Sequence, residues 1–108
     1  MDRTSRLARR LMADDKEERK RAVAEAFDGL ARSLRFKNGY MAFEWSRDYS
    51  SDGRQVTVAA NLQGSFPVYG SSLDGYLQSV AEAKKAYDEG VRKFAELGRR
   101  MNVTVRQK

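Results

Sequence analysis

The chain contains no cysteine and no histidine, and these two absences remove most of the side chains that do chemistry at neutral pH. Without cysteine there is no disulfide, thiolate nucleophile or thiolate metal ligand. Without histidine the chain lacks the commonest general base, a frequent metal ligand and the usual partner of a catalytic serine. We therefore expect a protein that is not an enzyme and that uses no metal or other cofactor. An enzyme would need a closed apolar pocket holding Glu44, Asp48 or Tyr69.

Long apolar runs are also missing, and Pro67 is the only proline. No segment is apolar for the roughly 20 residues that a membrane-spanning helix needs, and no apolar stretch follows the N-terminus as in a secretory signal. We therefore expect a cytoplasmic protein. The 108 residues, 41% of them apolar, suit one small domain with a modest core. We expect that domain to span residues 14–108, preceded by a basic arm or short helix over residues 1–13.

What the chain has in excess is positive charge. The 21 basic and 15 acidic residues give a net charge of +6, and arginine outnumbers lysine by 14 to 7. The excess lies in the flanking segments 1–35 and 72–108, whereas segment 36–71 is balanced. A basic protein can bind nucleic acid, an anionic membrane surface or an acidic protein, and composition does not choose among them.

The hydrophobic pattern predicts a helix, a β-hairpin, a second helix and a short strand. The first helix is expected up to Asn38-Gly39, a typical C-terminal stop, with Val23, Phe27, Leu30 and Leu34 on its apolar face. Asp52-Gly53 predicts a two-residue type I′ turn. The resulting hairpin collects one apolar face, which consists of Met41, Phe43, Trp45, Tyr49, Val56, Val58, Ala60 and Leu62. This register makes the aromatic residues part of the core rather than a platform for stacking nucleic-acid bases.

The second helix is expected from Ser71 or Ser72 onward, and its length implies either a kink at Gly90 or Gly98 or an end that projects from the domain. Its apolar stripe consists of Leu73, Leu77, Val80, Tyr87, Val91, Phe94 and Met101. Phe66–Tyr69 could form an edge strand, and Val103–Val105 a C-terminal strand. The expected fold is α+β, in the order α-β-β-α-β, with two long helices on one face of a small antiparallel sheet.

This order resembles that of type II KH modules and of ribosome-binding factor A. Residues 46–49 and 56–58 are similar to the first hairpin of that factor, and residues 92–105 are similar to its closing helix and strand. The GXXG loop of KH modules has no counterpart here. No residue role is therefore carried over, and no family is assigned.

The candidate binding residues are arginines and lysines in two places. Lys85, Arg92 and Arg99 recur every seven residues on the second helix, with Lys93 and Arg100 in a second row. We expect binding to nucleic acid or a ribonucleoprotein through phosphate contacts. The full candidate set is Arg3, Arg6, Arg9, Arg10, Lys85, Arg92, Arg99 and Arg100.

Each part of this set has an alternative explanation. The arm could be a solvated terminal helix or lie on an anionic membrane. The helix rows could be stabilising pairs, because Glu89 precedes Lys93 and Glu96 precedes Arg100 by four residues. A second hypothesis for function is a protein–protein module, such as an adaptor, an inhibitor or a small phage-type protein that acts on an acidic protein target, with a homodimer possible through the second helix.

One further charge stands out. The hairpin register places Arg47 on the apolar face, opposite Val58. A charge there needs a partner or a route to solvent. We expect a helix aspartate or glutamate to pair with it, and the alternative is that Arg47 points into a partner site.

Overall fold

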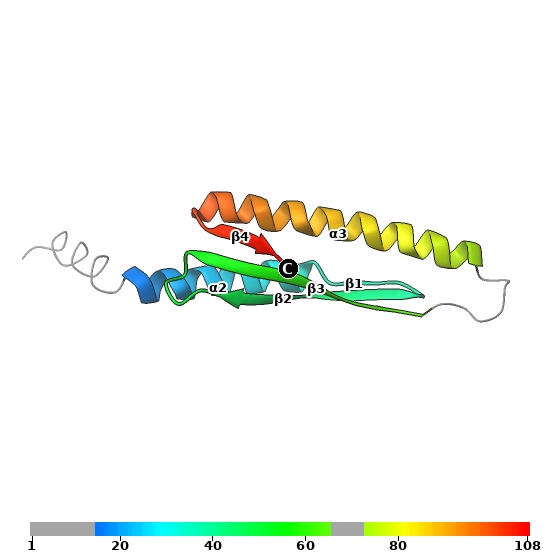
Figure 1. The fold of residues 1–108 in the computed structure, drawn as a ribbon, viewed down its shortest axis with the longest axis horizontal. Helices are drawn as coiled ribbons and strands as arrows, with labels where there is room; N and C mark the ends of the chain where they lie inside the picture. Colours follow the sequence, from blue (N-terminus) through cyan, green and yellow to red (C-terminus); the bar gives the residue numbers. More distant parts are fainter. Residues whose placement is uncertain (1–14, 66–72) are drawn as a thin grey trace, which may run out of the picture.

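The computed structural model describes residues 15–65 and 73–108, and it shows an α+β fold (Figure 1). The elements are α2 (Asp15–Ser33), β1 (Phe36–Lys37), β2 (Met41–Tyr49), β3 (Gln55–Gly64), α3 (Leu73–Met101) and β4 (Thr104–Gln107). The four strands form one sheet in the order β1-β2-β3-β4. Both helices pack on the same face of it, as expected. The expected N-terminal arm and the expected edge strand at residues 66–69 lie outside the described residues.

The sheet is mixed rather than purely antiparallel. β1 with β2 and β2 with β3 are antiparallel pairs, whereas β3 and β4 are parallel. A parallel pair needs a crossover, and α3 provides it by carrying the chain back along the sheet between β3 and β4. The C-terminal strand was predicted, but its direction was not.

The hairpin register is confirmed over its whole length. Trp45 lies opposite Ala60, and Phe43 lies opposite Leu62. The turn type is wrong, because a type I′ turn needs positive φ at both central residues, and of the two only Gly53 has it, at +70°. Ser50 pairs with Gln55 instead, which leaves a four-residue loop that preserves the same register.

The predicted end of the first helix is also wrong. α2 ends at Ser33, and Phe36–Lys37 forms the added strand β1. Phe36 pairs with Phe43 and stacks on its ring at a centroid distance of 5.3 Å. Asn38 belongs to the turn that follows, where its side-chain oxygen accepts the backbone N–H groups of Tyr40 and Met41. The helix therefore ends before the local stop signal, and the partly buried Phe36 makes a tertiary contact with Phe43 instead of extending α2.

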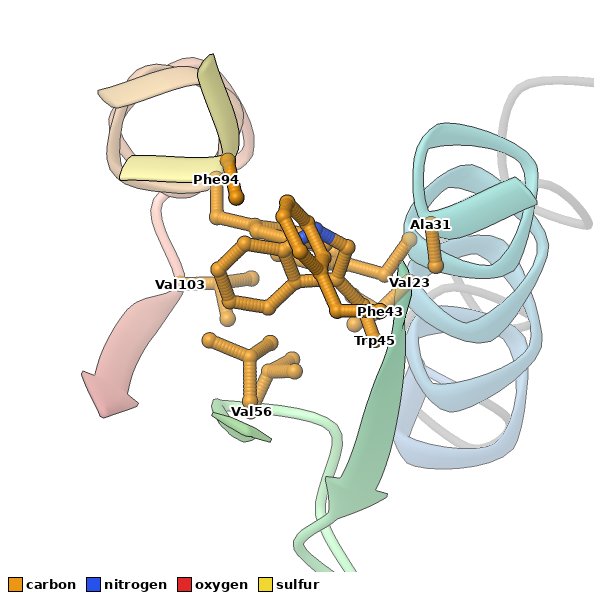
Figure 2. Packing of buried hydrophobic residues seen from close by; sticks show 10 residues of the cluster. Val23, Ala31, Phe43, Trp45, Val56, Phe94 and Val103 are labelled. Carbon is orange, nitrogen blue, oxygen red and sulfur yellow. The ribbon is translucent and has the colours of Figure 1, made fainter. Parts of the chain in front are cut away.

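The core lies between the two helices and the covered face of the sheet (Figure 2). Aromatic rings dominate it: Phe94 of α3 stacks on Phe27 of α2 and meets the edge of Trp45 at 5.0 Å. Phe43 and Trp45 are each only 2% exposed, which confirms them as core residues. The buried apolar residues are Val23, Phe27, Ala31, Phe43, Trp45, Val56, Val58, Ala83, Phe94 and Val103.

α3 runs without interruption for 29 residues, so the expected glycine kink is absent from it. Gly90 and Gly98 instead allow α3 to pack closely against neighbouring residues. A Cβ on Gly90 would lie 2.6 Å from Cζ2 of Trp45, and one on Gly98 would lie 2.8 Å from the carbonyl oxygen of Val103. Both positions therefore bring the helix axis close to the sheet.

Three leucines predicted for the covered apolar faces are exposed. Leu62 of β3 is 55% exposed, and Leu73 and Leu77 of α3 are 43% and 54% exposed. α2 ends at Ser33 and β4 pairs only with residues 55–58, so neither element extends over this end of the hairpin. The apolar pattern correctly predicted which residues share a face, but α2 and β4 end before they can cover these leucines.

Candidate functional site

Three separate segments meet at one end of the domain, where α2 begins and α3 ends (Figure 1). The loop between β2 and β3 touches α2, because Gly53 lies directly against the backbone of Lys20 and the Asp52 carbonyl accepts a hydrogen bond from Arg19 at 3.1 Å. The same loop touches the corner after α3, where the backbone N–H of Thr104 donates to the Arg54 carbonyl at 2.9 Å. We call residues 15–21, 50–54 and 96–108 together the basic end.

The loop itself is held by its own polar side chains. The Ser50 hydroxyl donates to Asp52 at 2.7 Å and accepts the backbone N–H groups of Arg54 and Gln55. The pKa of Asp52 is lowered, chiefly because the Ser50 hydroxyl and then the Arg54 N–H donate to its carboxylate. This arrangement fixes the loop against α2 and places the Arg54 side chain in solvent.

The basic end carries the whole charge excess of the described residues. It holds nine basic and five acidic residues, a net charge of +4. The rest of the described chain holds eight basic and eight acidic residues, which cancel. Folding therefore concentrates at one end an excess that the sequence distributes over two distant segments.

Arg99 and Arg100 are the predicted site residues that lie at this end. Both are exposed in the last turn of α3, where the helix dipole favours positive charge. Among the residues that the structure describes, neither has an ion-pair partner. Their guanidinium groups are available to an anion from solvent.

The other two predicted residues of α3 do not join them. Arg92 lies between Glu89 and Glu96, at 3.8 and 3.2 Å, and Lys93 pairs with Glu89 at 3.6 Å. For Arg92 and Lys93 the stabilising-pair interpretation is therefore the better one. Lys85 is exposed, but it lies about 21 Å along the helix from Arg99 at 1.5 Å per residue.

Other cations of the basic end were not among the predicted site residues. Lys16, Lys20 and Arg21 are exposed on the first turns of α2, and Arg54 and Arg106 are exposed on the loop and on β4. The sequence signal for those on α2 is the unbroken run of charged residues at 14–21. Arg3, Arg6, Arg9 and Arg10 lie outside the described residues.

Arg47 has the structural partner that the register predicted. Its Nε donates to Oδ1 of Asp28 at 2.9 Å, and another guanidinium nitrogen donates to the Trp45 carbonyl at 2.6 Å. The Tyr49 hydroxyl donates to the same Asp28 oxygen at 2.5 Å. The hydrogen bond from Tyr49 lowers the pKa of Asp28, and the hydrogen bond from Arg47 lowers it further. Burial raises the pKa of Tyr49, and its hydrogen bond to Asp28 adds to this increase. This network joins α2 to the outer edge of β2.

The described residues offer little that resembles a catalytic site. A shallow depression of about 360 Å³ lies against Glu44, Asn61 and Gln63, but Glu44 is exposed there and pairs with Arg35 at 3.4 Å. Asp48 is exposed on the uncovered face of the sheet. Over residues 15–65 and 73–108 no group of three or more acidic side chains could hold a metal ion. Within the same ranges, no helix is both long and apolar enough to cross a bilayer.

Comparison with protein-family models, with curated proteins and with solved structures finds no match for this chain.

Proposed function

We propose that this protein binds the phosphate backbone of nucleic acid, alone or in a ribonucleoprotein, through its basic end. The observation that supports this most directly is the placement of the net +4 charge, with Arg99 and Arg100 exposed and free of carboxylate partners among the described residues. Neutralising phosphates releases condensed counterions, and this release supplies most of the affinity of sequence-independent binding.

The chemistry of the side chains favours phosphate as the anion. Arginine presents a planar fork of donors that matches two phosphate oxygens, and it is the main basic residue of this end. Arg3, Arg6, Arg9 and Arg10 precede α2 in the sequence, and they are the further arginines of this proposal. Arg92 and Lys93 contribute less, because their charges are already balanced by Glu89 and Glu96.

The test is fluorescence anisotropy with labelled duplex DNA, single-stranded DNA and RNA of generic sequence, at low and near-physiological salt. Arg99→Gln with Arg100→Gln should weaken binding and reduce the slope of log K against log salt by about 1.8 on duplex DNA, at about 0.9 for each phosphate that the variant no longer neutralises. The matched control is Lys84→Gln with Lys85→Gln, which removes the same charge from the same helix and should leave the slope nearly unchanged.

Changing Arg3, Arg6, Arg9 and Arg10 to Ala measures the share of the arm separately. If the wild-type protein binds none of the three probes at low salt, the proposal is wrong and an acidic protein surface becomes the better candidate partner. If the two double variants reduce the slope by the same amount, then net charge is responsible for binding and the basic end is not a site.

A further inference from the structure

Two segments at the end of the domain opposite the basic end carry little charge. β3 has no charged residue in its ten positions, and residues 75–81 of α3 have none, although a third of the whole chain is charged. Of the three exposed leucines, Leu62 lies on β3, and Leu73 and Leu77 lie on the first turns of α3, where Asp74 is the one charged residue before Glu82. We call residues 59–65 and 73–81 together the neutral end.

The outer edge of β3 is open at the neutral end. Odd-numbered residues of β3 bond to β2, as the Ser50 N–H to Gln55 carbonyl bond shows. Even-numbered residues face β4, since the Lys108 N–H donates to the Val58 carbonyl. β4 reaches no further than Val58, so the backbone groups of Leu62 and Gly64 point outward. Within the described chain they meet no further strand.

The other sheet edges in the described residues are protected by charge, and this one is not. Arg47 folds over the free edge of β2 and bonds the Trp45 carbonyl there. The edge strands β1 and β4 carry the exposed cations Lys37 and Arg106. Inward-pointing charges and edge lysines are the usual devices that stop strands of two molecules from pairing. The edge over residues 60–64 has none of them.

We propose that this edge pairs with the same edge of a second copy of the chain, antiparallel about a two-fold axis at Leu62. The pairing joins the two sheets into one and supplies partners to the outward backbone groups of both copies. Leu62 then lies beside its symmetry mate on the helix side, and Ala60 lies opposite Gly64, whose small size leaves room for close approach. On the uncovered face, Asn61 comes next to Gln63 of the second copy, so that two amides face each other.

A second copy fits this surface better than a charged partner does. An uncharged edge has nothing to attract an acidic protein or a phosphate. Each copy carries a net charge of +6, and contact through the neutral ends keeps the two basic ends apart. A two-fold contact uses the same surface on both copies, so no such surface remains free and association stops at the dimer.

The contact differs from the homodimer that the sequence suggested through the second helix. Most of the stripe of α3 expected to form that seam is occupied within one chain, because Phe94 is buried and Tyr87, Val91 and Met101 pack against the core. What α3 can add to a dimer is its exposed first turns, where Leu73 and Leu77 lie.

Light scattering after size-exclusion chromatography tests the proposal on the full chain over a range of concentrations. The wild-type mass should rise from 12.3 kDa toward twice that value. Leu62→Lys places a like charge on the two-fold axis and should hold the mass at that of the monomer. Its matched control, Gln55→Lys, adds the same charge to an exposed position at the other end of the same strand and should dimerise as the wild type does.

A cross-link gives an independent readout, since the chain has no cysteine of its own. Paired residues in an antiparallel ladder have Cα atoms about 5.5 Å apart, within the range that a disulfide spans. Leu62→Cys should therefore give a covalent dimer under mild oxidation, and Lys85→Cys should not. A wild-type protein that stays monomeric at the highest concentration overturns the proposal and leaves residues 66–72, or a foreign strand, to cover the edge. A dimer that survives Leu62→Lys overturns it as well.

Discussion

The packing of α3 on Trp45 makes Gly90 the position where a single methyl group should do the most harm. Trp45 is buried, and Gly90 lies against the long edge of its ring. A Cβ there would lie 2.6 Å from Cζ2 and 3.0 Å from Cε2 of the indole. Carbon atoms in contact normally stand about 3.5–4.0 Å apart, so Gly90→Ala requires a shift of roughly 1 Å.

The ring has no free space into which it can move. Tyr87 stacks on it at 5.4 Å, and Phe94 and Phe43 meet it at 5.0 and 5.8 Å. Overpacking of a core costs about 1–3 kcal/mol of stability. We expect a cost near the upper end of this range, because the Trp45 ring is rigid and packed on several sides. Alanine regains about 1 kcal/mol in helix propensity over glycine. Gly90→Ala should therefore lower the free energy of unfolding by about 1–2 kcal/mol, or the Tm by about 4–16 °C.

Gly29→Ala is the matched control, because Gly29 is also helical and a Cβ there meets nothing within 4 Å. It should stabilise the protein by about 0.5–1 kcal/mol. Urea unfolding followed by far-ultraviolet circular dichroism measures both variants. Trp45→Phe should rescue Gly90→Ala, because phenylalanine lacks the clashing atoms and also the buried Nε1–H, which has no hydrogen-bond partner among the described residues. If Gly90→Ala stabilises the protein as much as Gly29→Ala does, the reasoning from close packing is refuted.

Three further predictions concern the Asp28 network and the loop at the basic end. Because burial raises the pKa of Tyr49, stability should be complete below about pH 10 and fall as the pH rises above it, and Tyr49→Phe should flatten the dependence of Tm on pH there. Because hydrogen bonds from Tyr49 and Arg47 lower the pKa of Asp28, its contribution should be present above about pH 4 and lost in acid. Asp28→Asn should thus cost about 1–3 kcal/mol in urea unfolding at pH 7, with a smaller deficit at pH 3, and equal deficits would contradict this. Gly53→Ala should lower the Tm, because residue 53 has a φ of +70° and an added Cβ would lie 2.8 Å from the backbone of Lys20. An unchanged Tm would show that the protein does not need this close contact.

The hairpin could be predicted from the sequence because two local signals agree on it. Alternating apolar residues fix which side chains share a face, and Asp52-Gly53 fixes where the chain reverses. The register survived an error in the turn type, since a four-residue loop centred at the same place keeps every pair. The same register also predicted that Arg47 needs an acidic partner, and Asp28 is that partner.

What the sequence could not show depends on contacts between distant segments. The two residues of β1 pair with β2, and Phe36 stacks on Phe43, but nothing local distinguishes these residues from a last helical turn. Periodicity likewise marks Leu62 and Leu77 as apolar-face residues, but exposure depends on where the neighbouring elements end. The candidate site has the same limit: the flanking segments were known to be basic, but only the topology brings the start of α2 and the end of α3 together.

The segregation of charge along the domain makes the two proposals independent in experiment. Arg99 and Arg100 lie at the basic end, so their removal should change the salt dependence of nucleic-acid binding and leave the molecular mass of the protein unchanged. Leu62 lies at the neutral end, so Leu62→Lys should change the mass and leave the salt slope for one basic end unchanged.

A dimer joined at Leu62 also places its basic ends far apart. A long duplex can then bridge both ends, and a duplex too short for that can occupy only one. The dimer should therefore show a steeper salt slope on the long duplex than on the short one, and the Leu62→Lys monomer should show the same slope on both.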